Sequence, residues 1–166
     1  QGSDLIKSNN TNRLKKLGIK VFIGQKKNNI INAKIIVVST AISEKNEEFI
    51  AAKKMFIPIV HRSEMLGELM RLRQSIAIAG THGKTTTTSL IAKMIEENGM
   101  DPTIINGGII SSLDSNARLG NGEWMVVEAD ESDGSFTKLN PTAAIITNID
   151  LEHLDYHKTE DNLENA

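Results

Sequence analysis

The sequence predicts an α/β fold with a mostly parallel sheet, arranged as two consecutive segments that meet near residues 73–75. Two observations support this prediction. Short apolar runs alternate with longer segments of helical pattern along the chain, the order typical of parallel sheets. Several of these runs contain four or more consecutive apolar residues, as strands buried on both faces do.

The first segment, residues 1–74, contains three expected strands and three expected helices. Strands are predicted over residues 19–23, 33–38 and 57–60, and the strand at 33–38 is expected to be buried on both faces because of its run of Ile and Val. Helices are predicted over residues 10–17, 46–55 and 63–73. Gly18 is expected to end the first helix in the left-handed conformation, and Ser63 is expected to cap the third.

The second segment, residues 75–166, begins with a strand at 76–79 and a helix at 85–97. The helix is expected to bury a stripe made of Leu90, Ile91, Met94 and Ile95. Further strands are predicted at 103–106, 124–128 and 143–147. Residues 107–122 are interpreted as a polar, glycine-containing loop, and residues 159–166 as the start of a helix.

Composition excludes several functional classes. The net charge of −2, without a large block of one sign, is unlike the basic stripe of a general nucleic-acid binder. The absence of cysteine excludes disulfides and thiolate metal sites and fits a reducing cytoplasm. No apolar run approaches the roughly 18 residues needed to span a bilayer, so no membrane association is expected.

A glycine-rich turn before the helix predicted at 85–97 is the strongest functional signal. It follows the strand at 76–79 and reads Gly80-Thr81-His82-Gly83-Lys84-Thr85-Thr86. Backbone N–H groups of such a turn point at an anion, the lysine adds a charge toward the outer phosphates, and the threonine hydroxyl can bind Mg²⁺. The loop is shorter than the general pattern, because Ile78 stands where its first glycine would fall. The sequence therefore predicts a compact phosphate-binding loop.

Two other strands end in residues that can take part in chemistry. Glu128 ends the strand at 124–128, and His153 follows the strand at 143–147. In an open parallel sheet, ligands lie at the carboxyl ends of strands, so Thr85, Glu128 and His153 are expected to converge on a Mg²⁺-nucleotide if these strands are neighbours. The alternatives are a solvated acidic loop at 128–133 and a surface histidine at 153. A zinc pair of His153 and His157 is disfavoured because no third ligand is evident.

Four stretches of the chain together resemble the Mur ligases of bacterial cell-wall synthesis, most closely the alanine-adding members. They are Val38-Ser39-Thr40-Ala41-Ile42; the phosphate loop; Asn106-Gly107-Gly108 with Ser115-Asn116-Ala117-Arg118-Leu119-Gly120; and Glu128-Ala129-Asp130-Glu131-Ser132-Asp133 with Thr147-Asn148-Ile149-Asp150 and His153-Leu154-Asp155. One departure from the family pattern is Glu152, where an aspartate is common.

The resemblance implies the end of a Rossmann-like UDP-binding domain over residues 1–74 and the start of a P-loop-type ATP-binding domain over residues 75–166. It also implies that a further amino-acid-binding domain lies outside this sequence, so that the chain is expected to be an internal piece of a longer protein, inactive alone. By the same resemblance, the loop from Gly80 to Thr86 binds ATP. Lys84, Glu128 and His153 serve catalysis, and Thr85, Glu128 and His153 bind Mg²⁺. Ser39, Thr40 and Ala41 border the UDP site, while Asn106, Gly107, Asn116, Ala117 and Arg118 lie near the muramoyl substrate.

The activity implied by the resemblance is the ATP-dependent joining of L-alanine to UDP-N-acetylmuramate through an acyl phosphate, in the cytoplasm. Four alternatives remain open. Two are other ligases of the superfamily, of the murein-peptide-recycling or folylpolyglutamate synthetase type. The third is a P-loop phosphotransferase or NTPase, and the fourth is a nucleotide-binding remnant without catalysis.

Overall fold

A computed structural model describes residues 1–110, 115–129 and 135–150. The chain divides into two compact units, Gln1–Arg62 and a second unit that begins at Ser63. This division falls before the third helix, whereas the sequence placed a boundary near residues 73–75. In the part of the chain that the structure describes, no helix is long and apolar enough to cross a membrane.

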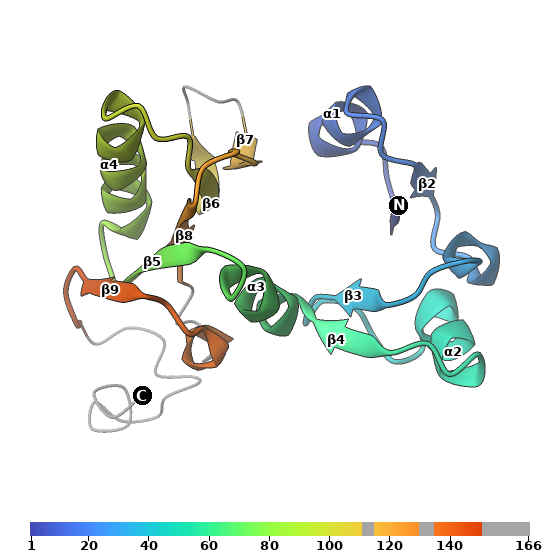
Figure 1. Ribbon diagram of the computed structural model, residues 1–166. Helices are drawn as coiled ribbons and strands as arrows, with labels where there is room; N and C mark the ends of the chain where they lie inside the picture. The colour runs from blue at the N-terminus through green and yellow to red at the C-terminus, as the bar shows by residue number, and fades with distance from the viewer. Residues whose placement is uncertain (111–114, 130–134, 151–166) are drawn as a thin grey trace. The chain divides into compact units, whose positions relative to one another are not determined.

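The first unit contains two small parallel sheets (Figure 1). Strand β1 (Gly2–Asp4) pairs with β2 (Val21–Ile23), and β3 (Ile36–Val38) pairs with β4 (Ile59–His61). Helix α1 (Asn9–Lys16) connects the first pair, and the second pair is connected through α2 (Glu47–Lys54). A 3-10 helix, Lys27–Ile30, packs against α2. Gly18 follows α1 with φ +79°, which confirms its predicted left-handed conformation.

The second unit is built on a five-stranded sheet of order β7-β6-β8-β5-β9. Its central strands are β5 (Gln74–Ala79) and β8 (Trp124–Glu128), flanked by β6 (Thr103–Ile110) and β9 (Ala143–Ile146). These four strands are parallel, and among the described residues only β7 (Ser115–Arg118) runs antiparallel, beside β6. The prediction of a mostly parallel sheet is therefore confirmed, and the carboxyl ends of four strands share one edge.

Both faces of this sheet are covered, because alternate residues of the central strands enter different apolar clusters. Ala77 and Val127 face α3 (Arg62–Met70) and the 3-10 helix Ser135–Lys138, through Met70 and Phe136. The intervening side chains face α4 (Lys84–Glu97); they are Ile78, Val126 and Ile104, which pack on Ala92 with Ile91 and Ile95. Period-two alternation thus produces a three-layer α/β/α sandwich.

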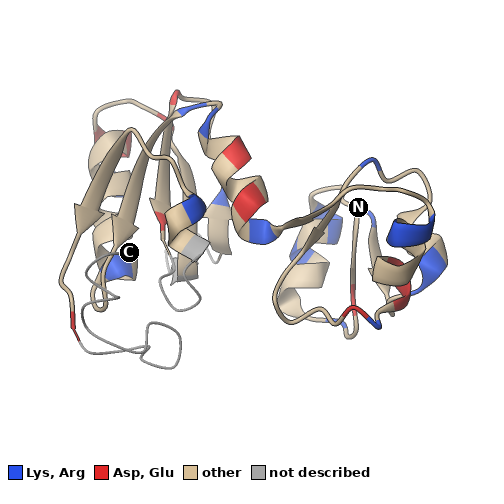
Figure 2. Ribbon diagram, turned by 90° about the horizontal axis from the view of Figure 1, so that it is seen from below, with Lys and Arg blue, Asp and Glu red and all other residues tan. Residues whose placement is uncertain are grey.

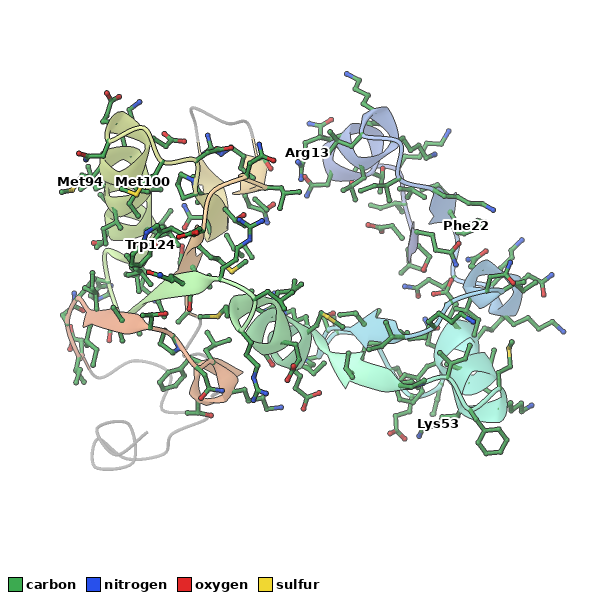
Figure 3. The ribbon with its side chains drawn as sticks, viewed as in Figure 1. Arg13, Phe22, Lys53, Met94, Met100 and Trp124 are labelled. Carbon is green, nitrogen blue, oxygen red and sulfur yellow. The ribbon has the colours of Figure 1, made fainter. Side chains whose placement is uncertain are left out.

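The prediction for the buried face of α4 was partly wrong. Ile91 and Ile95 pack against the sheet, but Leu90 and Met94 are 60% and 66% exposed. Figure 3 shows Met94 on α4, on the side away from β6 and β8. The side chains that complete the buried face are Thr88 and Ala92, whose small size lets the helix lie close to the strands.

The predicted loop at residues 107–122 was also wrong in large part. Strand β6 continues through Gly107 to Ile110, and the chain returns as β7, with Ile105 opposite Ala117. Asn116, Ala117 and Arg118 therefore lie on a strand rather than in a loop. Polar and glycine residues were interpreted as loop-forming, but an edge hairpin tolerates them because one face meets solvent.

Two predictions, one about the first unit and one about the helix that follows it, need correction. Ser63 does not cap the third helix, because β4 leads directly into α3 and Ser63 is buried within the first turn. The strand at 33–38 is shorter than expected and is not buried on both faces, since Val37 is 46% exposed. A two-stranded sheet provides too little neighbouring structure to cover both sides of β3.

Candidate active site

The phosphate loop connects β5 to α4 at the carboxyl edge of the five-stranded sheet. Gly80 and Gly83 have φ values of +118° and +79°, in the region that favours glycine. A Cβ atom on Gly80 would lie 2.3 Å from Oγ1 of Thr147 and 2.7 Å from the carbonyl oxygen of Asn148. The backbone of the segment after β9 therefore approaches the loop too closely for any side chain at position 80.

Helix α4 starts at Lys84 with Gly83 as its N-cap, and glycine has no side chain that could cap the first turn. The N–H groups at the start of a helix have no acceptor within the helix, and the helix dipole concentrates positive potential there. No acidic residue occupies this first turn. The arrangement favours an anion in front of the loop. Nucleotide binding by Gly80, Thr81, His82, Gly83, Lys84, Thr85 and Thr86 stays a prediction.

The ammonium group of Lys84 is held against the loop itself. Its Nζ donates hydrogen bonds to the carbonyl oxygens of Gly80 at 2.7 Å and Thr81 at 3.1 Å. These contacts fix the positive charge at the mouth of the loop, where a phosphate would lie beside the amino end of α4. The lysine therefore does not extend freely into solvent.

Thr85 and Glu128 come together as predicted, although they are 43 residues apart. The hydroxyl Oγ1 of Thr85 lies 3.0 Å and 3.2 Å from the two carboxylate oxygens of Glu128. This proximity follows from the sheet order, because β5 and β8 are neighbours and Ile78 lies opposite Glu128. The backbone N–H of Gly107 donates to Oε2 of Glu128 at 2.9 Å and holds the carboxylate from the side of β6.

The residues present fit a magnesium ion. Mg²⁺ prefers hard oxygen ligands, and it is usually bound by one or two carboxylates with several retained waters. A threonine hydroxyl and a carboxylate at the end of a phosphate loop supply that kind of oxygen. Among the described residues, no group of three or more His, Cys, Asp or Glu side chains gathers to hold a metal, so bound phosphate oxygens and water would complete the coordination.

The segment after β9 contacts the phosphate loop along its length. Asn148 contacts both backbone groups of His82, Thr147 donates to the same residue, and the backbone N–H of Asp150 donates to Oγ1 of Thr81 at 2.9 Å. Sequence reasoning identified residues 147–150 as a polar strand end but assigned them no contact with the loop. Their place directly after a strand adjacent to β5 was the available signal.

The other predicted residues of the second unit have different surroundings. Asn106 is buried beside the site, and its Nδ2 donates to Oγ of Ser89 at 3.3 Å. Asn116 and Ala117 are exposed on β7. The guanidinium of Arg118 contacts the carboxylates of Asp101 and Glu96, near the amino end of β6. A substrate contact for residues 116–118 stays a prediction.

In the first unit, Ser39, Thr40 and Ala41 form the turn after β3. Ser39 borders a cavity of about 320 Å³ that is also lined by Gly2, Ser3, Gln25, Asn46 and Glu48. The Glu48 carboxylate accepts hydrogen bonds from Oγ of Ser3 and Nδ2 of Asn29, both at 2.6 Å. Apolar residues such as Val38, Ile42 and Phe49 line the same cavity, so the turn adjoins a hollow of mixed polar and apolar lining at the carboxyl end of β3.

His153 and His157 lie outside the described residues, as do Asp130, Glu131, Ser132 and Asp133 of the acidic run. The structure therefore places Glu128 but not His153, and the predicted metal-binding role of the histidine stays a prediction. The helical pattern expected at 159–166 falls outside the described residues too.

Figure 2 colours the charged residues along the ribbon of the described residues. Helix α1 carries only basic charge, from Arg13, Lys15 and Lys16, whereas α2 begins with two glutamates and ends with two lysines. The small net charge of the sequence is therefore the sum of regions that differ in sign.

Comparisons with known proteins support the sequence resemblance. Residues 1–74 match the Mur ligase family catalytic domain, and residues 78–166 match the Mur ligase middle domain. The chain is 61% identical over 166 residues to the UDP-N-acetylmuramate–L-alanine ligase of Parvibaculum lavamentivorans, and the match covers 100% of this chain and 34% of that protein. The chain spans about a third of the length of the curated relatives it matches.

Solved structures give the same result. The UDP-N-acetylmuramate–alanine ligase of Thermotoga maritima matches with a TM-score of 0.88 and 30% identity, covering 99% of this chain and 39% of that one. The UDP-N-acetylmuramate:L-alanyl-gamma-D-glutamyl-meso-diaminopimelate ligase of Neisseria meningitides matches with a TM-score of 0.85 and 24% identity, over 99% of this chain and 57% of that one, and this likeness concerns the fold alone. Because the middle-domain match covers more than half of its residues, the chain belongs to the Mur ligase family.

Proposed function

We propose that this chain provides part of the nucleotide site of an ATP-dependent ligase that joins L-alanine to UDP-N-acetylmuramate. The observation that carries the proposal is the meeting of Thr85 and Glu128 at a glycine-rich loop and a helix whose N-cap is a glycine. The names of the similar proteins support the choice of substrates, because the high-identity relatives are UDP-N-acetylmuramate–L-alanine ligases. Mur ligases in general depend on ATP.

The residues of the phosphate loop bind the nucleotide in this proposal. Backbone N–H groups of the loop and the first turn of α4 hold the phosphates, and Lys84 neutralises their charge. Thr85 and Glu128 hold Mg²⁺, which supplies positive charge to the phosphate oxygens when it is bound. His153 is proposed as a further metal ligand, and its place next to β9 in the sequence supports this role.

The reaction requires two anions, the substrate carboxylate and the terminal phosphate, to approach each other. The protein groups that reduce this repulsion are Lys84 and the amino end of α4. Transfer of the phosphoryl group to the carboxylate forms an acyl phosphate, and the amine of L-alanine then displaces phosphate to form the amide. This sequence of steps needs positioning and charge from the protein rather than a nucleophilic side chain.

Binding of the UDP-sugar is proposed for both units. Ser39, Thr40 and Ala41 would contact the UDP portion, a role supported by the cavity beside Ser39, whose lining is partly polar and partly apolar. Asn106 and Gly107 would lie near the muramoyl portion, because Gly107 donates to Glu128 at the carboxyl edge of the sheet and Asn106 directly precedes Gly107, hydrogen-bonded to Ser89 of α4. Asn116, Ala117 and Arg118 complete the proposed set.

The test is phosphate release by the protein expressed from the complete reading frame that encodes this chain. We expect release from Mg·ATP to require both UDP-N-acetylmuramate and L-alanine, with formation of UDP-N-acetylmuramoyl-alanine detected by mass spectrometry. Release without any acceptor would identify an NTPase and contradict the proposal. Release that requires a muropeptide instead of L-alanine would identify a recycling ligase.

A matched pair of variants separates the site from the fold. Glu128→Gln keeps the size of the side chain but removes the charge that attracts Mg²⁺, so turnover is expected to fall by at least about 100-fold. Glu123→Gln changes a carboxylate at the opposite end of the same strand and is expected to leave turnover unchanged. Equal activity of the two variants would refute the role of Glu128.

A further inference from the structure

The segment that follows β9 continues alongside the phosphate loop after the sheet has ended. Strand β9 pairs with β5 up to Ala79 and Ile146. The next backbone hydrogen bonds run from the N–H of Thr147 to the carbonyl of Ala79 at 3.0 Å and from the N–H of Thr81 to the carbonyl of Asn148 at 3.0 Å. Main-chain pairing therefore extends two residues beyond the end of each strand, to Thr81 and Asn148.

Beyond that point, the side chain of Asn148 takes over the pairing. Its Oδ1 accepts a hydrogen bond from the N–H of His82 at 2.9 Å, and its Nδ2 donates to the carbonyl of His82 at 3.0 Å. A carboxamide that binds both the N–H and the carbonyl of one residue fixes the orientation of that residue's backbone, as pairing with a neighbouring strand would. His82 is thus held through its backbone, whatever its imidazole contacts.

Thr147 adds a second restraint on the same residue. Its Oγ1 lies 2.7 Å from the carbonyl oxygen of His82 and 3.2 Å from that of Ala79. Gly80 makes this arrangement possible, because a Cβ there would overlap Oγ1 of Thr147. The hydroxyl therefore occupies the space that the missing side chain of Gly80 leaves.

We propose that Thr147 and Asn148 are positioning residues that hold the Thr81–His82 backbone in the shape that receives nucleotide phosphates. The inference rests on the proposed function, since it assigns these residues to the same nucleotide site. Neither residue needs to touch the nucleotide, because both act through the loop. A loop fixed before binding loses less conformational entropy when the ligand arrives, and this raises affinity.

The experiment measures binding of Mg·ATP by calorimetry in the protein from the complete reading frame. Thr147→Val keeps the shape of the side chain but removes the hydroxyl, whereas Thr147→Ser keeps the hydroxyl. We expect Thr147→Val to raise the Kd for Mg·ATP about tenfold, the effect of one lost hydrogen bond, and Thr147→Ser to restore it to within about threefold of the wild type. Asn148→Ala, which removes two contacts, is expected to raise the Kd by more than Thr147→Val.

Thr142 at the other end of β9 provides the matched control. Its Oγ1 accepts a hydrogen bond from the N–H of Ser75 at 3.0 Å, far along the strand from the loop. Thr142→Val should lower the melting temperature but leave the Kd for Mg·ATP unchanged. In turnover assays, Thr147→Val should raise the KM for ATP and leave the KM for UDP-N-acetylmuramate unchanged, a split that general destabilisation would not produce.

The possible failures are distinguishable. If the wild-type protein does not bind Mg·ATP, the proposed function fails and the positioning role fails with it. If the wild type binds Mg·ATP and both Thr147→Val and Asn148→Ala bind it with the same Kd as the wild type, the positioning role alone is refuted. If Asn148→Ala does not fold, the difference in Kd between Thr147→Val and Thr147→Ser tests the positioning role. The role is also refuted if Thr142→Val shifts the Kd for Mg·ATP as much as Thr147→Val does.

Discussion

Replacement of Gly107 by alanine tests the geometry of the proposed metal site. A Cβ at this position would lie 2.8 Å from Oε1 of Glu128, 3.1 Å from its Cδ and 3.4 Å from Oε2. The backbone of Gly107 does not have positive φ, so alanine itself is compatible with the strand. The carboxylate is the end of a flexible side chain and would move by a few tenths of an ångström or more.

This movement should weaken binding without weakening the fold. The carboxylate is held by the N–H of Gly107 at 2.9 Å and lies 3.0 Å from Oγ1 of Thr85, so displacement disturbs both contacts. A hydrogen bond to a charged group contributes about 1.5–3 kcal/mol, which corresponds to roughly a 10- to 100-fold loss in affinity. Alanine in a strand interior is favoured over glycine by about 0.5–1 kcal/mol, so thermal stability should be equal or slightly higher.

The assay is calorimetric titration with ATP in the presence of Mg²⁺ and, separately, of a chelator. Gly107→Ala should reduce affinity only where Mg²⁺ is present. Gly67→Ala is the matched control, because its Cβ would lie 2.9 Å from the backbone carbonyl of Lys138, which cannot move as freely. That variant should lower the melting temperature and leave nucleotide affinity unchanged. Unaltered Mg²⁺-dependent binding in Gly107→Ala would refute the reasoning.

Three other predictions concern the loop, the core and an exposed carboxylate. Lys84→Ala should abolish measurable binding of Mg·ATP by calorimetry, whereas Lys93→Ala on the outer face of α4 should bind as the wild type does. Val127→Ala, at a fully buried position, should lower the free energy of unfolding in urea by about 2 kcal/mol. Hydrogen bonds from Asn121 lower the pKa of the Asp101 carboxyl below 3.8, so its stabilising effect is present at neutral pH and is lost as the pH falls through the lowered pKa. The difference in urea midpoint between wild type and Asp101→Asn should therefore disappear in acid, and a difference that persists there would contradict this assignment.

The elements with strong local signals could be predicted from the sequence. Strand β8 occupies the predicted residues 124–128, and α4 begins one residue before its predicted start. The helix start could be predicted because glycine at a left-handed position and a following run of helix-compatible residues are local properties. The meeting of Thr85 with Glu128 also followed, since both were assigned to the carboxyl ends of parallel strands.

Features set by tertiary packing were predicted less well. The stripe on α4 was assigned by hydrophobicity, but the sheet surface accepts Thr88 and Ala92 and leaves Leu90 and Met94 exposed. Close approach of a helix to a sheet favours small side chains, which a hydrophobicity pattern does not rank highly. The pairing of β6 with β7 was missed because Gly107, Gly108, Ser115 and Asn116 have low intrinsic strand propensity, and packing against neighbouring strands decides the outcome.

Gly83 at the start of α4 has a consequence for attempts to stabilise the protein. Among the described residues, a Cβ at position 83 would meet nothing within 4 Å, so space alone would admit a side chain. The φ of +79° is left-handed, however, so any residue other than glycine is strained there, asparagine least. A side chain that capped the helix would accept from the first-turn N–H groups, and those are the donors that the proposed phosphate would use. A substitution at position 83 would therefore cost both backbone strain and ligand affinity.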